Sequence, residues 1–102
     1  MVGRIWHGYT TVDKADTYYN ILTAKVIPGI AAMKIEGYQS IQVLRRPLKD
    51  EVEFITIMWF DSLEKIKAFT GEDYETSHVP AEARAVLKRF DDRSQHYELM
   101  EE

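Results

Sequence analysis

Three histidines, His7, His78 and His96, are the residues of this chain best suited to acid–base or metal chemistry. Imidazole is the side chain whose ordinary pKa lies nearest neutrality, so a general base or a haem ligand is sought first among them. They lie far apart in the sequence, and no pair has the i, i+4 or HExxH spacing of a metal site. The chain also has no cysteine. We therefore expect no metal ion and no nucleophilic thiolate.

The most suggestive of these histidines is His78, which follows a stretch from Phe69 in which we expect a short helical piece over residues 73–78. Trp59 lies near the end of the most apolar segment, residues 51–60. If His78 overhangs the sheet face that carries Trp59, the two define a candidate pocket. The alternative is a solvated His78 before a proline turn and a Trp59 that belongs to the core.

Trp6 and His7 follow one another in the first predicted strand, so their side chains point to opposite faces of the sheet. Only one of them can face the pocket. The pattern does not say which, because a slip of one residue in register exchanges the two faces. His7 is thus a second candidate base and Trp6 a candidate pocket residue, whereas we expect His96 to be exposed or at an interface.

The elements that must position these residues alternate between strand and helix periodicity. A helix over residues 15–26 is expected to end at Pro28-Gly29, and Asp61 with Glu64 forms a capping box that opens a short helix closed by Gly71. A further helix begins at Pro80 and has an apolar stripe that reaches Phe90. Strands are predicted over residues 3–9, 38–45, 51–60 and 94–100.

This order predicts an α+β fold, the ferredoxin-like β-α-β-β-α-β unit, with both helices on one face of a four-stranded antiparallel sheet. The other face of the sheet is then not covered by helices. We expect Phe54, Met58 and Phe60 to point that way, which is too apolar a surface for a monomer. The sequence therefore predicts a homodimer whose sheets pack face to face into an α+β barrel.

Composition limits the remaining classes of function. With 102 residues, 45% of them hydrophobic, the chain is expected to form one domain over residues 1–102. No apolar run approaches the roughly 18 residues that span a bilayer, and a net charge of −4 with a single adjacent basic pair, Arg45-Arg46, argues against nucleic acid as a partner. The lack of cysteine and of a signal peptide favours the cytoplasm.

Four segments resemble the antibiotic biosynthesis monooxygenase domain, a family of dimeric α+β barrels. They are residues 4–8 (Arg-Ile-Trp-His-Gly), residues 53–64 at the end of the apolar strand, residues 67–75, and His96-Tyr-Glu near the end of the chain. The resemblance spans nearly the whole chain. It implies a homodimer with one pocket per subunit, formed between the helices and the sheet.

Catalytic members of that family fall into two groups. One oxidises polycyclic phenols to quinones with O2 and without metal or flavin, and the other binds haem through a histidine and degrades it. Trp59 and His78 look similar in position to a pocket tryptophan and a histidine of the haem-degrading group. Both groups usually place an asparagine in the first strand, where this chain has Trp6 and His7, and its single asparagine, Asn20, falls in the first helix.

The leading hypothesis is therefore a small monooxygenase that acts on an aromatic, phenol-like substrate without metal or flavin. His78 or His7 would remove the phenolic proton and Trp59 would line the pocket, together with Trp6, Ile57, Phe69 and Tyr74. One alternative is a non-enzymatic dimeric module that binds a small ligand or a partner, and another is other barrel chemistry such as isomerisation. Haem remains an alternative cofactor, with His78 as its axial ligand.

Overall fold

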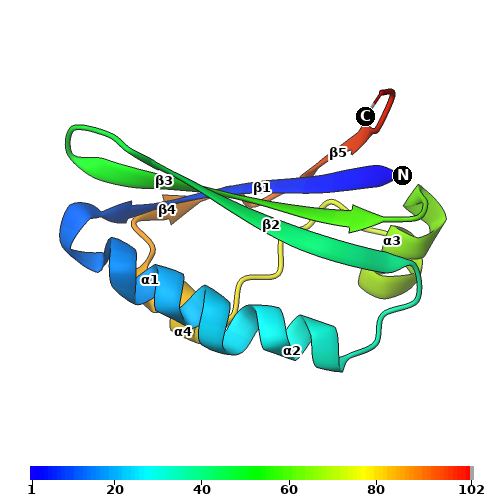
Figure 1. Cartoon of the computed structure of the whole chain (residues 1–102), viewed down its shortest axis with the longest axis horizontal. Helices are drawn as coiled ribbons and strands as arrows, with labels where there is room; N and C mark the ends of the chain where they lie inside the picture. The colour runs from blue at the N-terminus through cyan, green and yellow to red at the C-terminus, as the bar shows by residue number, and fades with distance from the viewer. Residues whose placement is uncertain (102) are drawn as a thin grey trace.

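The central strand of the sheet is β1 (Val2–Thr11), which pairs antiparallel with β3 (Glu51–Phe60) on one side. On its other side β1 pairs with two short strands, β4 (Arg89–Phe90) and β5 (Gln95–Glu98), and β2 (Tyr38–Pro47) pairs with β3 at the opposite edge. The computed structural model describes residues 1–101. All helices lie on one face of this sheet (Figure 1). The predicted ferredoxin-like α+β fold is confirmed, with β4 and β5 in place of the single last strand.

The first helical segment is longer than predicted, because Pro28-Gly29 does not end it. A short 3-10 turn, η1 (Val12–Lys14), leads into α1 (Ala15–Ile21), a π-helical turn, η2 (Leu22–Val26), and α2 (Ile27–Ala32). In η2 the Ile27 N–H bonds to the Leu22 carbonyl, five residues back. This wider turn shifts the hydrogen-bond register just before Pro28, which lets the helix continue past a residue that normally interrupts it.

The second helical region contains α3 (Leu63–Thr70) and α4 (Ala81–Val86). Gly71 ends α3 as predicted, with φ of 97°. The N-cap is Ser62, whose hydroxyl accepts the Lys65 N–H at 3.3 Å, and not Asp61. The prediction of a helical piece over residues 73–78 is wrong: this segment is irregular, and an isolated bridge between Thr76 and Arg93 joins it to the connection between β4 (Arg89–Phe90) and β5 (Gln95–Glu98). Phe90, expected in a helix, lies in β4.

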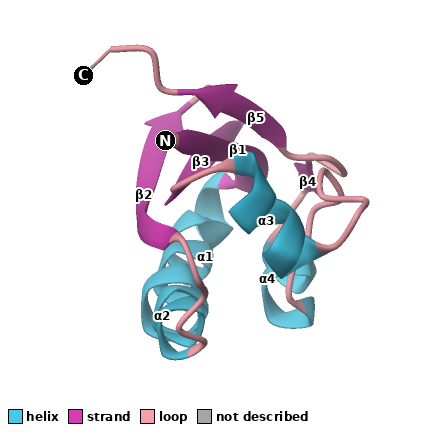
Figure 2. Ribbon diagram, turned by 90° about the vertical axis from the view of Figure 1, so that its right-hand side faces the viewer, coloured by secondary structure: helices cyan, strands magenta, loops and turns pink. Residues whose placement is uncertain are grey.

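The core forms between the sheet and the helices. Phe54 is completely buried and meets the ring of Tyr18 from α1 edge to face, with 4.8 Å between ring centroids. Leu22 of η2 and Ala83 of α4 belong to the same buried cluster. In Figure 2 α1 and α2 lie beneath one half of the sheet, and α3 and α4 lie beneath the other half of the same face.

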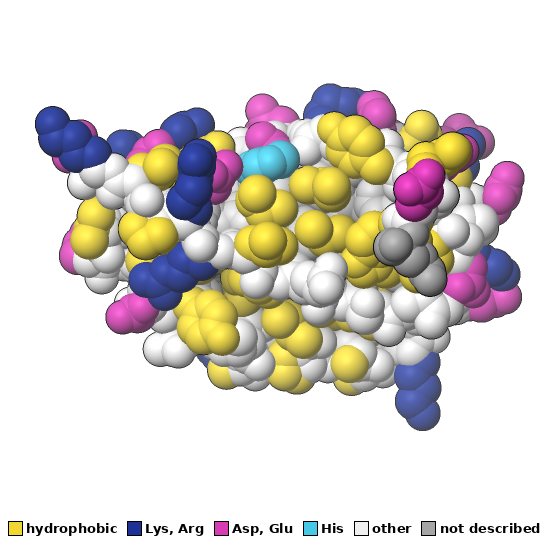
Figure 3. Space-filling model, turned by 45° about the horizontal axis from the view of Figure 1, so that its top comes forward, with side chains coloured by type: hydrophobic (Ala, Val, Ile, Leu, Met, Phe, Trp, Pro, Cys, Tyr) yellow, Lys and Arg dark blue, Asp and Glu magenta, His cyan; other side chains and the backbone are white. Residues whose placement is uncertain are grey.

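The prediction that Phe54, Met58 and Phe60 point away from the helices is therefore wrong. Phe54 and Phe60 are both fully buried, and Met58 lines a cavity on the helix side. The strand period showed which residues share a face, but β3 is apolar on both faces, so the pattern could not say which face meets the helices. The exposed face instead carries Ile55, Ile57 and Trp59 of β3, and apolar side chains gather across it (Figure 3).

Candidate functional site

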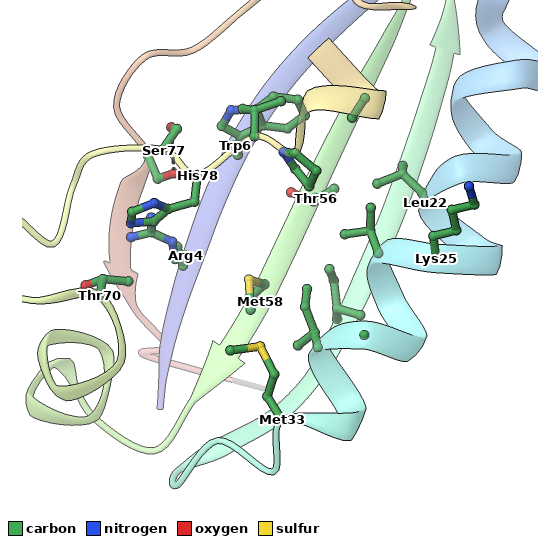
Figure 4. A pocket seen from close by; sticks show the side chains of 18 of the residues that line it. Arg4, Trp6, Leu22, Lys25, Met33, Thr56, Met58, Thr70, Ser77 and His78 are labelled. Carbon is green, nitrogen blue, oxygen red and sulfur yellow. Dashed lines mark hydrogen bonds between the residues drawn. The ribbon is translucent and has the colours of Figure 1, made fainter. Parts of the chain in front are cut away.

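A cavity of about 630 Å³ lies between the helix side of the sheet and the two helical regions (Figure 4). Its floor is formed by β1, β2 and β3, one wall by η2 and α2, and the other by α3 and residues 77–83. Most of the lining side chains are apolar. They are Trp6, Tyr18, Leu22, Val26, Ile30, Met33, Ile41, Met58, Phe69, Val79, Pro80 and Ala83. Such a surface favours a ligand with an apolar or aromatic body.

Trp6 is fixed in this cavity by β1 itself and by β4. Its indole N–H donates to the Asp91 carbonyl at 3.0 Å, and its ring lies 6.1 Å from the Phe90 ring. Gly8 lies two residues along on the same face of β1, and a Cβ there would come within 2.4 Å of the Trp6 ring. The absence of a side chain at Gly8 therefore allows the indole to lie along the strand.

His78 lies on the wall of the cavity, in the irregular segment that precedes α4. The cavity is on the helix side of the sheet and not, as was predicted, over the face that carries Trp59. The residue is exposed, as in the alternative of a solvated histidine before a proline turn. Its imidazole makes no hydrogen bond to any other residue between 1 and 101, so both ring nitrogens are free for a ligand. The neighbouring Ser77 hydroxyl lies 3.1 Å from that of Ser94, which is almost completely buried, and both line the cavity. Polar groups are thus gathered on one side of an otherwise apolar space.

Arg4 is the cavity residue that sequence reasoning missed. It is only 6% exposed, and its guanidinium donates to the carbonyls of Tyr74 and Thr76, the latter at 3.0 Å. Its Nη1 lies 2.9 Å from His96 Nε2. Figure 4 places it on the same side of the cavity as His78. The available signal was its position two residues before Trp6, on the same face of the same strand.

His96 is half-buried beside Arg4, so the expectation that it is exposed is wrong, whereas a place at an interface stays a prediction. Burial, followed by the positive charge of Arg4, lowers the pKa of His96 below its usual value. Because Arg4 can only donate, His96 Nε2 accepts, and the proton of the neutral ring is on Nδ1. That Nδ1 is buried without a partner among residues 1–101.

Two other predicted pocket residues lie near the cavity. Phe69 lines it from α3 and stacks on Phe60 with 6.1 Å between centroids. Tyr74 does not line the cavity: its ring packs against that of His96 at 5.1 Å, and its carbonyl accepts from Arg4. Tyr74 therefore holds the Arg4 guanidinium through its carbonyl and does not itself line the cavity.

Trp59 and Ile57 do not lie in the cavity, so their predicted placement is wrong. They share the face of β3 that points away from the helices, and the Trp59 indole donates to Gln42 Oε1 at 3.0 Å. Gly3 of β1 lies opposite Trp59, and a Cβ there would come within 3.1 Å of the indole ring. The pocket tryptophan is Trp6, one strand away.

His7 lies on the same outer face as Trp59, opposite Ile55. Its Nδ1 lies 2.8 Å from an Asp91 carboxylate oxygen that also accepts the His7 backbone N–H at 3.1 Å. The structure therefore does not bring His7 and His78 together. Of the two candidate bases, His78 is the one in the cavity.

Residues 1–101 contain no group of three or more His, Cys, Asp or Glu side chains arranged to hold a metal ion. The helices in the described part of the chain are all too short or too polar to cross a membrane.

Fold and cavity together define a ferredoxin-like α+β protein with a cavity between sheet and helices. A candidate antibiotic biosynthesis monooxygenase from Bacillus cereus has this fold, with a TM-score of 0.69 over 99% of this chain and 92% of its own, at 13% sequence identity. The heme-degrader MhuD from Mycobacterium tuberculosis, solved with two hemes in its active site, matches with a TM-score of 0.63 over 100% of this chain and 98% of its own, at 17% identity. No protein-family model matches the sequence, and no curated protein is significantly similar to it. The resemblance to the antibiotic biosynthesis monooxygenase domain is thus confirmed at the level of the fold.

Proposed function

We propose that this protein is a small monooxygenase that oxidises an aromatic, phenol-like substrate with O2, without metal or flavin. The reaction takes place in the cavity between the sheet and the helices. The observation that carries the proposal is His78, an exposed imidazole that makes no hydrogen bond to residues 1–101 and lies on the wall of a mainly apolar cavity. The fold shared with a candidate monooxygenase and a heme-degrading enzyme is consistent with it. Fold alone does not establish an activity, so the proposal depends on the cavity.

In this mechanism the aromatic substrate lies against Trp6 and Phe69, whose apolar side chains shield its ring from water. His78 accepts the phenolic proton, which leaves an electron-rich anion whose ring carbon reacts with O2. One oxygen atom forms the new carbonyl of a quinone and the other leaves as water, so the substrate supplies all the electrons. His78 is the catalytic base, and Trp6 positions the ring.

Oxygen uptake in the presence of a chelator tests this proposal, with a panel of hydroxylated naphthalenes and anthracenes as substrates. Loss of a general base lowers turnover by about a hundredfold or more, so we expect that loss in His78→Gln. His7→Asn is the matched control, because it removes an imidazole on the other face of the sheet and keeps a donor for Asp91. Equal turnover of wild type and His78→Gln would overturn the assignment of the base. Ligands that raise the melting temperature without oxygen uptake would support a non-enzymatic binding module.

Haem binding is a second candidate function, favoured by the same free imidazole. A single neutral histidine suffices to hold haem iron, and the apolar walls suit a porphyrin, so the residues present fit this group. His78 would hold the iron and Trp6 would contact the ring. Haem, when bound, would supply the oxygen chemistry that the side chains lack. Added haem should then give a Soret band that is lost in His78→Gln and kept in His7→Asn.

We further propose that a second copy of the chain covers the outer face of the sheet. That face carries Ile55, Ile57 and Trp59 of β3 next to Leu44 and Tyr97, which are 48% and 59% exposed. Apolar surface of this kind across a whole sheet is typical of an interface, and symmetric dimers are its commonest solution.

Sedimentation equilibrium tests the dimer. We expect Ile57→Glu to sediment as a monomer, because it would place a charge in the middle of the buried face. Val12→Glu adds the same charge at another exposed apolar residue, in η1, and should remain dimeric. A monomeric wild type at micromolar concentration would contradict the proposal.

A further inference from the structure

We propose that the cavity selects ligands that carry a carboxylate, and that Arg4 binds this group, so that the substrate is an aromatic acid and not a neutral ring. This inference rests on the proposed function for the aromatic part of the ligand and adds the group that anchors it. It follows from three observations: the donors that Arg4 leaves free, its uncompensated charge, and its place in the cavity.

Arg4 has unused hydrogen-bonding capacity. Its side chain offers five N–H donors, of which three have acceptors: the carbonyls of Tyr74 and Thr76, and His96 Nε2. The Nε–H and one Nη2–H have no acceptor among residues 1–101. A carboxylate can accept two parallel N–H groups from one guanidinium, which is the strongest and most directional way to bind it.

The charge of Arg4 has no direct counter-charge among residues 1–101. A buried arginine is normally paired with a carboxylate, yet no ion pair within residues 1–101 includes Arg4. The two acids of the adjacent segment, Asp73 and Glu75, bind Arg93 instead, each at 3.0 Å. Its third partner, His96, is neutral when it accepts from Arg4. A buried cation whose hydrogen-bond partners are all neutral attracts an anion from solution.

Arg4 also lies where a ligand can reach it. It lines the same cavity as Trp6 and His78, so a carboxylate on Arg4 would leave its ring against the indole. The hydroxyls of Ser77 and Ser94 line the cavity too and could donate to the same anion. Lys25, the other lysine or arginine lining the cavity, is ion-paired with Glu82 at 2.6 Å and is largely exposed, so it offers a weaker site.

Calorimetric titration of the protein with a matched pair of ligands, 1-hydroxy-2-naphthoate and 1-naphthol, tests the inference. These compounds differ by one carboxylate. We expect the acid to bind at least about tenfold more tightly, equivalent to about 1.4 kcal/mol. Equal or tighter binding of the naphthol to the wild-type protein would overturn the inference and leave the proposed function intact. If neither compound binds, the cavity does not accept an aromatic ring and both proposals fail.

Variants of the basic residues show which side chain binds the carboxylate. Arg4→Lys keeps the charge but loses the bidentate geometry and should reduce the preference for the acid, whereas Lys49→Gln in the hairpin turn should not change it. If Lys25→Gln removes the preference instead, the anion binds at the rim and the inference is wrong. Because Arg4 also holds residues 74–76, its substitution can disturb folding, and a measurement on the wild type is needed as well. The Arg4 Nε–H signal in an NMR spectrum should shift with the acid and not with naphthol, and an unchanged signal would contradict direct contact.

The carboxylate could belong to an aromatic acid or to the propionates of a porphyrin. Titration with protoporphyrin and with its dimethyl ester separates these sources. A preference for the free porphyrin together with no preference for the naphthoate would assign the Arg4 site to a tetrapyrrole. A preference in the naphthoate pair assigns it to the smaller aromatic acid.

Discussion

Gly8→Ala tests whether the cavity depends on the placement of the Trp6 ring. The new Cβ would lie 2.4 Å and 2.7 Å from two carbons of the indole and 3.1 Å from a Leu87 methyl group. Overpacking of this kind costs about 1 to 3 kcal/mol, and displacing the indole also removes its hydrogen bond to the Asp91 carbonyl, worth about 1 kcal/mol. Alanine recovers about 0.5 to 1 kcal/mol of backbone entropy relative to glycine.

The net loss of unfolding free energy is therefore about 1 to 3.5 kcal/mol, which lowers the melting temperature of a chain this size by about 4 to 28 °C. Calorimetry at fixed protein concentration measures it. Gly29→Ala is the matched control: a Cβ there meets nothing within 4 Å in α2, so the same exchange should stabilise by up to about 1 kcal/mol.

Two results show whether the loss of stability in Gly8→Ala comes from its contact with the Trp6 ring. Adding Trp6→Leu should remove most of the penalty of Gly8→Ala, because the two substitutions share one contact and their effects are not additive. A Gly8→Ala protein as stable as wild type would refute the reasoning, since the indole would then have another position of equal energy.

Three further predictions concern stability. Phe54→Ala, at a fully buried ring, should cost about 3 to 5 kcal/mol in urea unfolding, and a loss below 1 kcal/mol would contradict this core. Burial raises the pKa of Tyr18 above its ordinary value of 10.0, so the unfolded chain loses its proton first and stability falls as pH rises above about 10; Tyr18→Phe should flatten that fall. The pKa of His96 is lowered from 6.5, so stability falls as pH drops below that value, and His96→Gln, which still accepts from Arg4, should reduce the acid loss. Unfolding at several pH values checks both variants.

Much of the fold could be predicted from local patterns. Alternation along residues 51–60, the glycine that ends α3 and the order of strands and helices all depend on neighbours in the sequence, and each was confirmed. One error was local: Pro28 was expected to end a helix, and the π turn before it was not foreseen. Another fell where a distant contact decides: residues 73–78 are irregular and bridge to Arg93 through Thr76.

The candidate site shows the same division. His78, Phe69 and Trp6 were predicted around a pocket and line it, whereas Trp59, Ile57 and His7 lie on the other face. Strand periodicity determines that residues 57 and 59 share a face, yet both faces of β3 are apolar, so the choice between helices and solvent is made by tertiary packing.

The sequence by itself determined that this chain builds an antiparallel sheet with helices on one face, because hydrophobic period and turn residues act over a few positions. Only the tertiary structure brought Arg4 beside His96, 92 positions away, and turned Asp73 and Glu75 toward Arg93 instead. Whether a buried cation is compensated depends on which groups surround it in space, and no local pattern carries that information.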